Sequence, residues 1–369
     1  MEPIYISTNA DLEQVAISCA DVSVVALDTE FARFNTYYPM VGLVQLATDK
    51  HCFLIDPVAI SNLDPLSELL IRPDLLKVVH AGSEDMEVFQ YSLGVTPSPV
   101  FDTQIAAAIL GIGFSLSYQK LVAHYLNIDV PKEETRSDWL RRPLSASQLQ
   151  YAALDVVYLY QVYFDQLRQL EQLDRAKWVL EESAKLNDLL PTAIDPADSY
   201  LKGKGLHVLN RRQLGALQFL YAWRERLARS ENIPRNRIVD PKQLLVIVKL
   251  GLDSIQKLRE QSDLSSGQLR RYGSHILDVM QQSKNRPEPD LPLSIHADSE
   301  PIDKKKLKFL KKTVDNRATE LGISPELLSR RRDLESLLRT ARRGAAELPE
   351  FMKGWREEVI GRTLLEAVQ

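Results

Sequence analysis

The sequence VSVVALDTEF, residues 22–31, combines a β-strand pattern with two acids. Valines dominate its first half, which favours an extended chain. Side chains alternate between the faces of a strand, so Asp28 and Glu30 share one face, roughly 6.6 Å apart along the strand. Two carboxylates in so apolar a strand repel each other and lose hydration, which predicts a bound cation or a basic neighbour. The simpler alternative is a strand end with solvated acids.

The residues around this strand predict an α/β domain. Two strand-like runs follow closely, at 42–48 and 51–56, and indicate a meander. Helical and extended patterns then alternate, with a helix at 63–71, a strand at 77–81, a helix at 83–93, and further helices at 102–110, 116–126 and 145–170. This order favours a central sheet flanked by helices.

A second acidic motif is HAGSED, residues 80–85. It runs from an expected strand end into a helix and places Asp85 in the first helical turn. Ser83 as N-cap, with acids favoured by the helix dipole, would explain the motif without any catalytic role. A strand-to-helix junction is also where α/β sheets place their sites. The motif by itself leaves both readings open.

A third motif, YAALD at residues 151–155, lies inside the longest expected helix. The spacing of four places the Tyr151 phenol and the Asp155 carboxylate on one face of that helix. Alanine, leucine and valine surround Asp155 in the sequence, and an acid in such a setting needs a partner. The three motifs together supply four carboxylates and one tyrosine.

Such a set of acids predicts a site for hard divalent cations. Carboxylate oxygens suit Mg²⁺ or Mn²⁺, and the two cysteines of the chain, Cys19 and Cys52, offer no zinc cluster. Two such ions about 3.5–4 Å apart would serve the in-line hydrolysis of a phosphodiester. We therefore expect a nuclease with two divalent cations, Mg²⁺ or Mn²⁺, and no nucleotide cofactor, because no phosphate-binding GxxxxGK[ST] loop is present.

The three motifs, in this order and on these elements, resemble the DEDD exonuclease superfamily in its tyrosine-containing subclass. The flanking sequences TYYP at 36–39, GLVQL at 42–46 and SDWL at 137–140 are similar to the bacterial ribonuclease D family within it. This resemblance implies a ribonuclease-H-like exonuclease domain, with a mixed central sheet flanked by helices, followed by two all-α helical-bundle domains of the helicase-and-RNase-D C-terminal (HRDC) type.

The resemblance also implies roles for the site residues. Asp28 would contact both metal ions, Glu30 and Asp155 would complete the site of one, and Asp85 would serve the other. Tyr151 would orient the attacking water. The implied activity is removal of single 5′-mononucleotides from the 3′ end of RNA, with tRNA precursors as the expected substrate.

The domain organisation follows from breaks in the helical pattern. Two prolines and the sequence KGKG interrupt it between 190 and 205. Beyond this break, the sequence around Ile233 and Pro234 is repeated around Ile323 and Pro325, which indicates two related helical modules. We expect a catalytic domain at 1–190, a linker at 191–207, and helical domains at 208–288 and 295–369.

Four further residues are candidates for substrate binding. Phe31 and Tyr37 follow the first acidic strand and could stack on terminal bases, although burial in the core would also account for Phe31. Arg136 and Trp139 could hold the terminal phosphate and base, or could simply anchor a loop. The sequence leaves these alternatives open.

Composition and charge limit the class of protein. The chain has 369 residues, 44% hydrophobic and 26% charged, which is typical of a globular protein with more than one domain. Its net charge of −4 hides basic runs, KKKLK at 304–308 and RRR at 330–332, which are either solvated helix faces or a nucleic-acid surface. Residues 1–15 have no signal-peptide pattern, and no membrane span is predicted, so we expect a cytoplasmic protein.

Three alternatives stay open at this stage. The acids cannot distinguish RNA from DNA, because metal ions act on the phosphate, so a DNA exonuclease of the same superfamily is the first alternative. The second is an inactive nucleic-acid-binding scaffold, for which the loss of an acid would be the expected sign. In the third, the helical modules of an active nuclease bind a protein rather than RNA.

Overall fold

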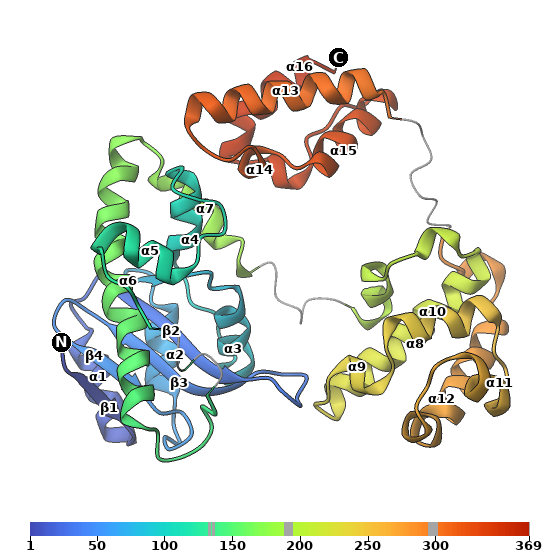
Figure 1. The fold of residues 1–369 in the computed structure, drawn as a ribbon, viewed down its shortest axis with the longest axis horizontal. Helices are drawn as coiled ribbons and strands as arrows, with labels where there is room; N and C mark the ends of the chain where they lie inside the picture. The colour runs from blue at the N-terminus through green and yellow to red at the C-terminus, as the bar shows by residue number, and fades with distance from the viewer. Residues whose placement is uncertain (132–133, 135–136, 188–194, 294–301, 369) are drawn as a thin grey trace. The chain divides into compact units, whose positions relative to one another are not determined.

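The computed structural model describes residues 1–131, 134, 137–187, 195–293 and 302–368. It divides into two compact units (Figure 1). The first contains Met1–Ala32, Met40–Leu190 and Ile302–Gln369, and the second contains Arg33–Pro39 and Pro191–Pro301. No helix among the described residues has the length and apolar character that a membrane span requires.

A six-stranded mixed sheet organises the first unit. Its strands are β1 (Pro3–Ile6), β2 (Val24–Ala32), β3 (Met40–Ala47), β4 (Cys52–Ile55), β5 (Leu76–Val79) and β6 (Val100–Asp102). They lie in the order β1-β4-β3-β2-β5-β6. Strands β2, β3 and β4 pair antiparallel, while β1 pairs with β4, and β5 with β2 and β6, in parallel. The predicted meander is thus the centre of the sheet.

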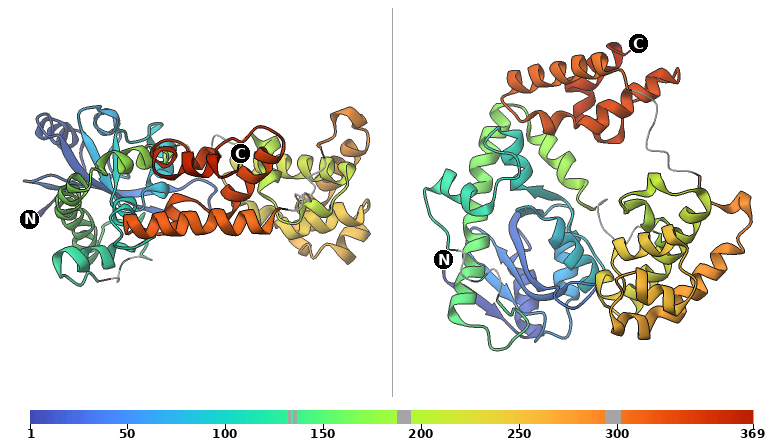
Figure 2. Two further views of the ribbon diagram at one scale, coloured as in Figure 1. Left: turned by 90° about the horizontal axis from the view of Figure 1, so that it is seen from above. Right: turned by 45° about the vertical axis from the view of Figure 1, so that its right-hand side comes forward.

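Helices cover both faces of this sheet. The helices of the domain are α1 (Asn9–Ser18), α2 (Asp64–Ile71), α3 (Ser83–Leu93), α4 (Thr103–Ile109), α5 (Tyr118–Leu126), α6 (Ala146–Gln172) and α7 (Ala176–Ala184). Figures 1 and 2 show the long helix α6 beside the sheet, where it packs on β2, β3 and β4. The prediction of an α/β domain with a mixed central sheet flanked by helices is confirmed.

The alternation of β2 determines which way the acids point. Val25 and Leu27 are fully buried in one core with residues of α1, α2 and α3. Ala26 lies in the other core, which contains residues of α6. Asp28 and Glu30 lie two and four residues after Ala26, so their side chains point to the same face of the sheet as Ala26. This is the face that α6 covers.

A second helical module also belongs to the first unit. It consists of α13 (Lys304–Leu321), α14 (Pro325–Leu328), α15 (Arg331–Arg342) and α16 (Arg362–Glu366). Helix α7 contacts it: the rings of Trp178 and Trp355 stack with centroids 4.5 Å apart, and the buried guanidinium of Arg356 donates to the Glu182 carboxylate. The sequence did not predict α7, and therefore not this attachment either.

The second unit contains the other helical module. Its helices are α8 (Arg211–Ser230), α9 (Arg235–Ile238), α10 (Pro241–Leu250), α11 (Ile255–Gln261) and α12 (Ser266–Lys284). The predicted linker at 191–207 contributes to this module within its described part. A 3₁₀ helix, Pro196–Lys202, packs on α8, and Tyr200 and Leu206 are buried in the core of the unit.

Candidate active site

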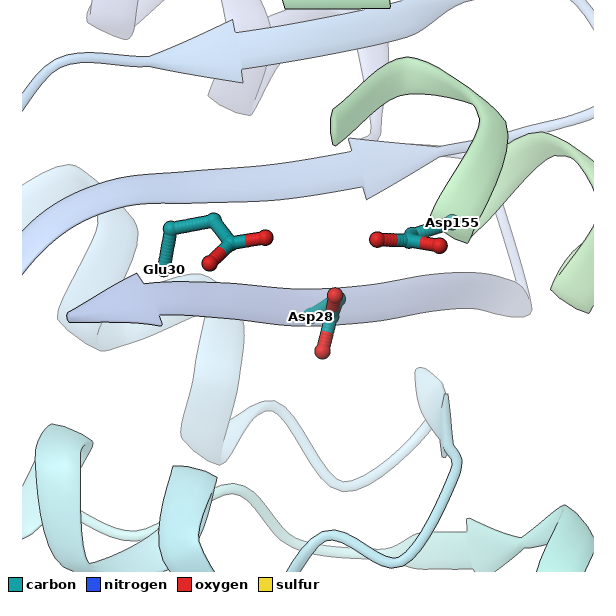
Figure 3. Close-up of side chains that lie close together, drawn as sticks. All are labelled: Asp28, Glu30 and Asp155. Atoms are coloured by element: carbon teal, nitrogen blue, oxygen red, sulfur yellow. The ribbon is translucent and has the colours of Figure 1, made fainter. Parts of the chain in front are cut away.

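Three of the predicted acids converge on one point of the first unit. Asp28 and Glu30 project from β2, and Asp155 reaches them from α6 (Figure 3). One carboxylate oxygen from each lies within 4.8 Å of the others. Asp28 and Glu30 are half-buried and Asp155 is buried. Residues 125 positions apart in the chain therefore form a single cluster of oxygen ligands.

Helix α6 fixes the position of Asp155 through its length and its cap. The helix begins with a capping box, in which the Ser145 hydroxyl accepts from the backbone N–H of Gln148 and the Gln148 side chain accepts from that of Ser145. Tyr118 donates its hydroxyl to the carbonyl oxygens of Leu154 and Asp155, at 2.9 and 2.7 Å. The Tyr151 phenol is hydrogen-bonded to the Asp155 carboxylate, as their spacing predicted.

Asp85 stands at the other side of Asp28, on the first turn of α3. It is buried, and the hydroxyl of Thr29, which lies between Asp28 and Glu30 on β2, donates to its carboxylate. Its charge contributes to raising the pKa values of both Asp28 and Glu30. Asp85 is not part of the cluster that Asp28 forms with Glu30 and Asp155. Asp85 is therefore a fourth carboxylate whose charge reaches the two acids of β2.

The turn before α3 depends on Asp102, the last residue of β6. Its carboxylate caps α4, and it also accepts the backbone N–H groups of Ala81 and Gly82, at 3.1 and 3.0 Å. Gly82, not Ser83, is the N-cap of α3. A Cβ at Gly82 would lie 2.6 Å from the side chain of Val79, so this tight turn requires glycine.

The environment of the acids opposes their ionisation. Burial, followed by the charges of Asp85 and Asp155, raises the pKa of Asp28 well above its ordinary value. Burial and the nearby Asp155 raise the pKa of Glu30 to about 9. Burial also raises the pKa of Asp155 to about 7 and that of Asp85 to about 6. In the described part of the chain, no lysine or arginine forms an ion pair with any of these four acids.

This arrangement fits divalent cations. The oxygen ligands converge and repel one another, and among the described residues no ion pair neutralises them, so a bound ion of charge +2 would supply the missing compensation. An all-carboxylate donor set suits a hard cation such as Mg²⁺ or Mn²⁺ better than zinc. Asp28, Glu30 and Asp155 could hold one ion, and Asp85 with Asp28 a second.

The other predicted residues lie outside the acid cluster. Phe31 follows Glu30 after a β-bulge and is half-buried. Trp139 is buried, with its ring centroid 6.2 Å from that of Tyr151, so it supports the tyrosine from the side. Tyr37 is buried in the second unit, where its ring is not open for base stacking in this conformation. Arg136 lies outside the described residues.

Sequence reasoning missed the residues that support the ligands. Thr29 was passed over because it separates two more conspicuous acids, and Tyr118 because its partner is the backbone of a helix 36 residues away. His80, at the start of the second acidic motif, contacts the Thr103 hydroxyl and the Leu116 carbonyl oxygen. Supporting contacts of this kind leave no signal in sequence spacing.

Comparison with known families agrees with the fold. The profile described as 3′-5′ exonuclease matches residues 3–171, that of the HRDC domain residues 213–280, and that of the ribonuclease D C-terminal HRDC domain residues 301–364. The ribonuclease D of Pseudomonas paraeruginosa is 39% identical over 99% of this chain and 97% of its own. That of Escherichia coli is 33% identical over 99% and 98%.

A solved structure extends the similarity to the whole fold. The crystal structure of Escherichia coli RNase D, described as an exoribonuclease involved in structured RNA processing, superimposes with a TM-score of 0.93 and 32% identity. The match covers 100% of this chain and 99% of that one.

The fold and the acid cluster thus define a 3′-5′ exonuclease of the DEDD type with two C-terminal helical modules. Within this class, the chain belongs to the ribonuclease D family. It is accordingly a hydrolase acting on RNA, a 3′-5′ exoribonuclease that depends on divalent metal ions.

Proposed function

We propose that the chain hydrolyses RNA by a two-metal-ion mechanism in which Asp28, Glu30, Asp85 and Asp155 hold the ions. The observation that carries this proposal is the convergence of Asp28, Glu30 and Asp155 within 4.8 Å, with Asp85 beside Asp28 as a separate ligand. Bound there, Mg²⁺ or Mn²⁺ would activate a water and stabilise the oxygen that leaves the scissile phosphate.

The protein groups around the ions have their own tasks. The Tyr151 hydroxyl, held by Asp155, orients the attacking water in line with the scissile phosphate. Thr29 fixes the carboxylate of Asp85 by donating to it. Tyr118 binds the backbone of the helix that carries Asp155, and Asp102 binds the turn that leads into the helix that carries Asp85. The acids stay close despite their repulsion because these contacts are built into the fold.

For the substrate, we propose RNA with a free 3′ end, probed first with tRNA precursors, and release of 5′-mononucleotides in the cytoplasm. The similarity to the Escherichia coli enzyme, described as acting in structured RNA processing, supports this proposal. Phe31 and Arg136 are the proposed contacts to the terminal nucleotide, and the buried Trp139 is proposed to support Tyr151 beside them. We propose domain boundaries at 1–190, 208–288 and 295–369, with 191–207 joining the first two.

The test is digestion of a 5′-labelled single-stranded RNA and of its DNA counterpart, each with Mg²⁺, Mn²⁺ or EDTA. We expect a ladder that shortens from the 3′ end of RNA with either metal and no reaction in EDTA. Faster shortening of DNA than of RNA would favour the DNA exonuclease instead. No shortening of either substrate would favour the inactive scaffold, although all four acids and Tyr151 are present.

A further inference from the structure

A basic groove lies on the second helical module, between α13 and the start of α15. It has a volume of about 590 Å³. The basic side chains that line it are Lys304, Lys308, Lys311, Arg330 and Arg331, against the acids Asp315 and Glu326. Two basic runs that are some 20 residues apart in the sequence thus meet at one surface.

Helical spacing selects the lysines that line the groove. Lys304, Lys308 and Lys311 are separated by four and three residues, which places them on one face of α13. All three are exposed, and within the described chain Lys304 and Lys308 form no ion pair. Lys305 and Lys312, on the same helix and equally exposed, do not line the groove.

The opposite wall is more rigid. The guanidinium of Arg330 lies 3.7 Å from the centroid of the Phe351 ring, and its Nε contacts the Asp333 carboxylate at 3.1 Å. Arg331 pairs with Glu335 on the outer side of α15, at 2.8 Å. On the groove side, hydrogen bonds from the Ser324 hydroxyl and from a backbone N–H lower the pKa of Glu326, and the charge of Lys311 lowers it further. Positive charge is therefore in excess, and one of its carriers is held in place before any ligand binds.

We propose that this groove binds the phosphodiester backbone of the RNA substrate, apart from the reacting 3′ end. The inference rests on the proposed function and extends it to a second contact with the substrate. Because the catalytic site is built from acids, it repels RNA except where metal ions intervene, so affinity has to come from another surface. Exposed lysines at helical intervals match a polyanion, since each can displace counterions from a phosphate.

The test compares two double variants of the full chain. Lys308→Gln/Lys311→Gln removes two charges that line the groove, and Lys305→Gln/Lys312→Gln removes two from the same helix outside it. Binding of an RNA hairpin with a single-stranded 3′ tail is measured by fluorescence anisotropy, in EDTA to prevent hydrolysis, over a series of KCl concentrations. Melting curves of both variants report any loss of folding.

For the groove variant, we expect affinity about tenfold weaker at low salt, and a plot of log K against log salt that is flatter by about 0.7–0.9 for each lysine. The control variant should bind like the unmodified protein. Equal losses in both variants, or wild-type binding by the groove variant, would overturn the inference and leave a protein partner as the alternative. Failure of the proposed function is seen separately, as the absence of metal-dependent shortening by the unmodified protein.

Discussion

Glu30 and Glu225 are both acids of the interior, yet their surroundings act on them in opposite directions. Glu30 stands among other carboxylates, and burial raises its pKa to about 9. Glu225, on α8 of the second unit, is 2% exposed. Arg235 and Arg229 bind its carboxylate, and the Tyr37 hydroxyl donates to it. Burial raises the pKa of Glu225, but these contacts outweigh burial and lower it to about 2.

The difference separates structural acids from functional ones. Where the fold supplies its own cations, as it does for Glu225, a buried carboxylate holds parts of the chain together. Where the fold brings carboxylates together without a cation of its own, their mutual repulsion destabilises the folded protein until a metal ion binds from solution. Activity should therefore depend on the first cluster and stability on the second.

The largest expected effect is that of Asp28→Asn. Because Asp28 belongs to both groups of ligands, we expect 3′-5′ shortening of RNA to slow by about 10³-fold or more. In EDTA, the unfolding free energy should be equal to or above that of the unmodified protein, because one source of repulsion is gone. Gel assays and urea unfolding measure the two quantities.

Metal binding provides the control for this variant. At a metal concentration about 100 times its Kd, Mg²⁺ should stabilise the unmodified protein by about 2.7 kcal/mol, and Asp28→Asn by much less. If Asp28→Asn lost stability in EDTA as well as activity, Asp28 would be a structural acid like Glu225, and the distinction between the two clusters would be wrong.

Glu225→Gln should have the opposite profile. The shift of its pKa from 4.5 to about 2 corresponds to about 3 kcal/mol at neutral pH, and the variant leaves two arginines without their partner. We expect unfolding at lower urea concentration. Glu231→Gln, which removes an exposed partner of Arg271, should change stability by under about 0.5 kcal/mol.

The pH dependence of the same variant follows from the sign of the shift. Since the folded pKa of Glu225 is depressed, its contribution is complete above pH 4.5 and is lost as pH falls toward 2. The unmodified protein should therefore lose more stability across this window than Glu225→Gln. If the stability of the two proteins fell in parallel with pH, the arginine and tyrosine contacts would not stabilise the ionised form of Glu225.

Tyr151→Phe tests a side chain that touches the functional cluster without being a metal ligand. Removal of a hydroxyl that orients water should slow hydrolysis by about 10²-fold and leave metal-induced stabilisation intact. Tyr160→Phe, on the same helix and without a hydrogen bond in the described structure, is the matched control. Equal rates for the two variants would remove Tyr151 from the proposed mechanism.

Strong periodicity made much of the fold predictable. Strands β2 and β3 and helix α6 have long, regular patterns, and their predicted bounds differ from the observed ones by a few residues at most. Strands β1 and β6, of four and three residues, are too short to show a pattern. Their pairing partners lie far along the chain, so nothing local marks them.

The candidate site was predictable as a set of residues but not as an arrangement. Each acid stands in a local motif, whereas the contacts of Thr29, Asp102 and Tyr118 join segments 20 or more residues apart. Tyr37 shows that nearness in sequence does not fix a position in the fold. Its closeness to Glu30 in sequence suggested the active site, but the chain leaves the first unit after Ala32, and Tyr37 packs in the second.

Among changes to the two clusters themselves, the smallest expected effect, and the finest test of the comparison, is that of Tyr37→Phe. The variant keeps the ring on which Arg235 stacks at 4.6 Å, and loses the hydroxyl that binds Glu225 and accepts from Arg235 at 2.7 Å. We expect a loss of about 1 kcal/mol in unfolding free energy and an unchanged KM for RNA. A raised KM without loss of stability would instead place the Tyr37 hydroxyl against the substrate, and would make its contact with Glu225 incidental.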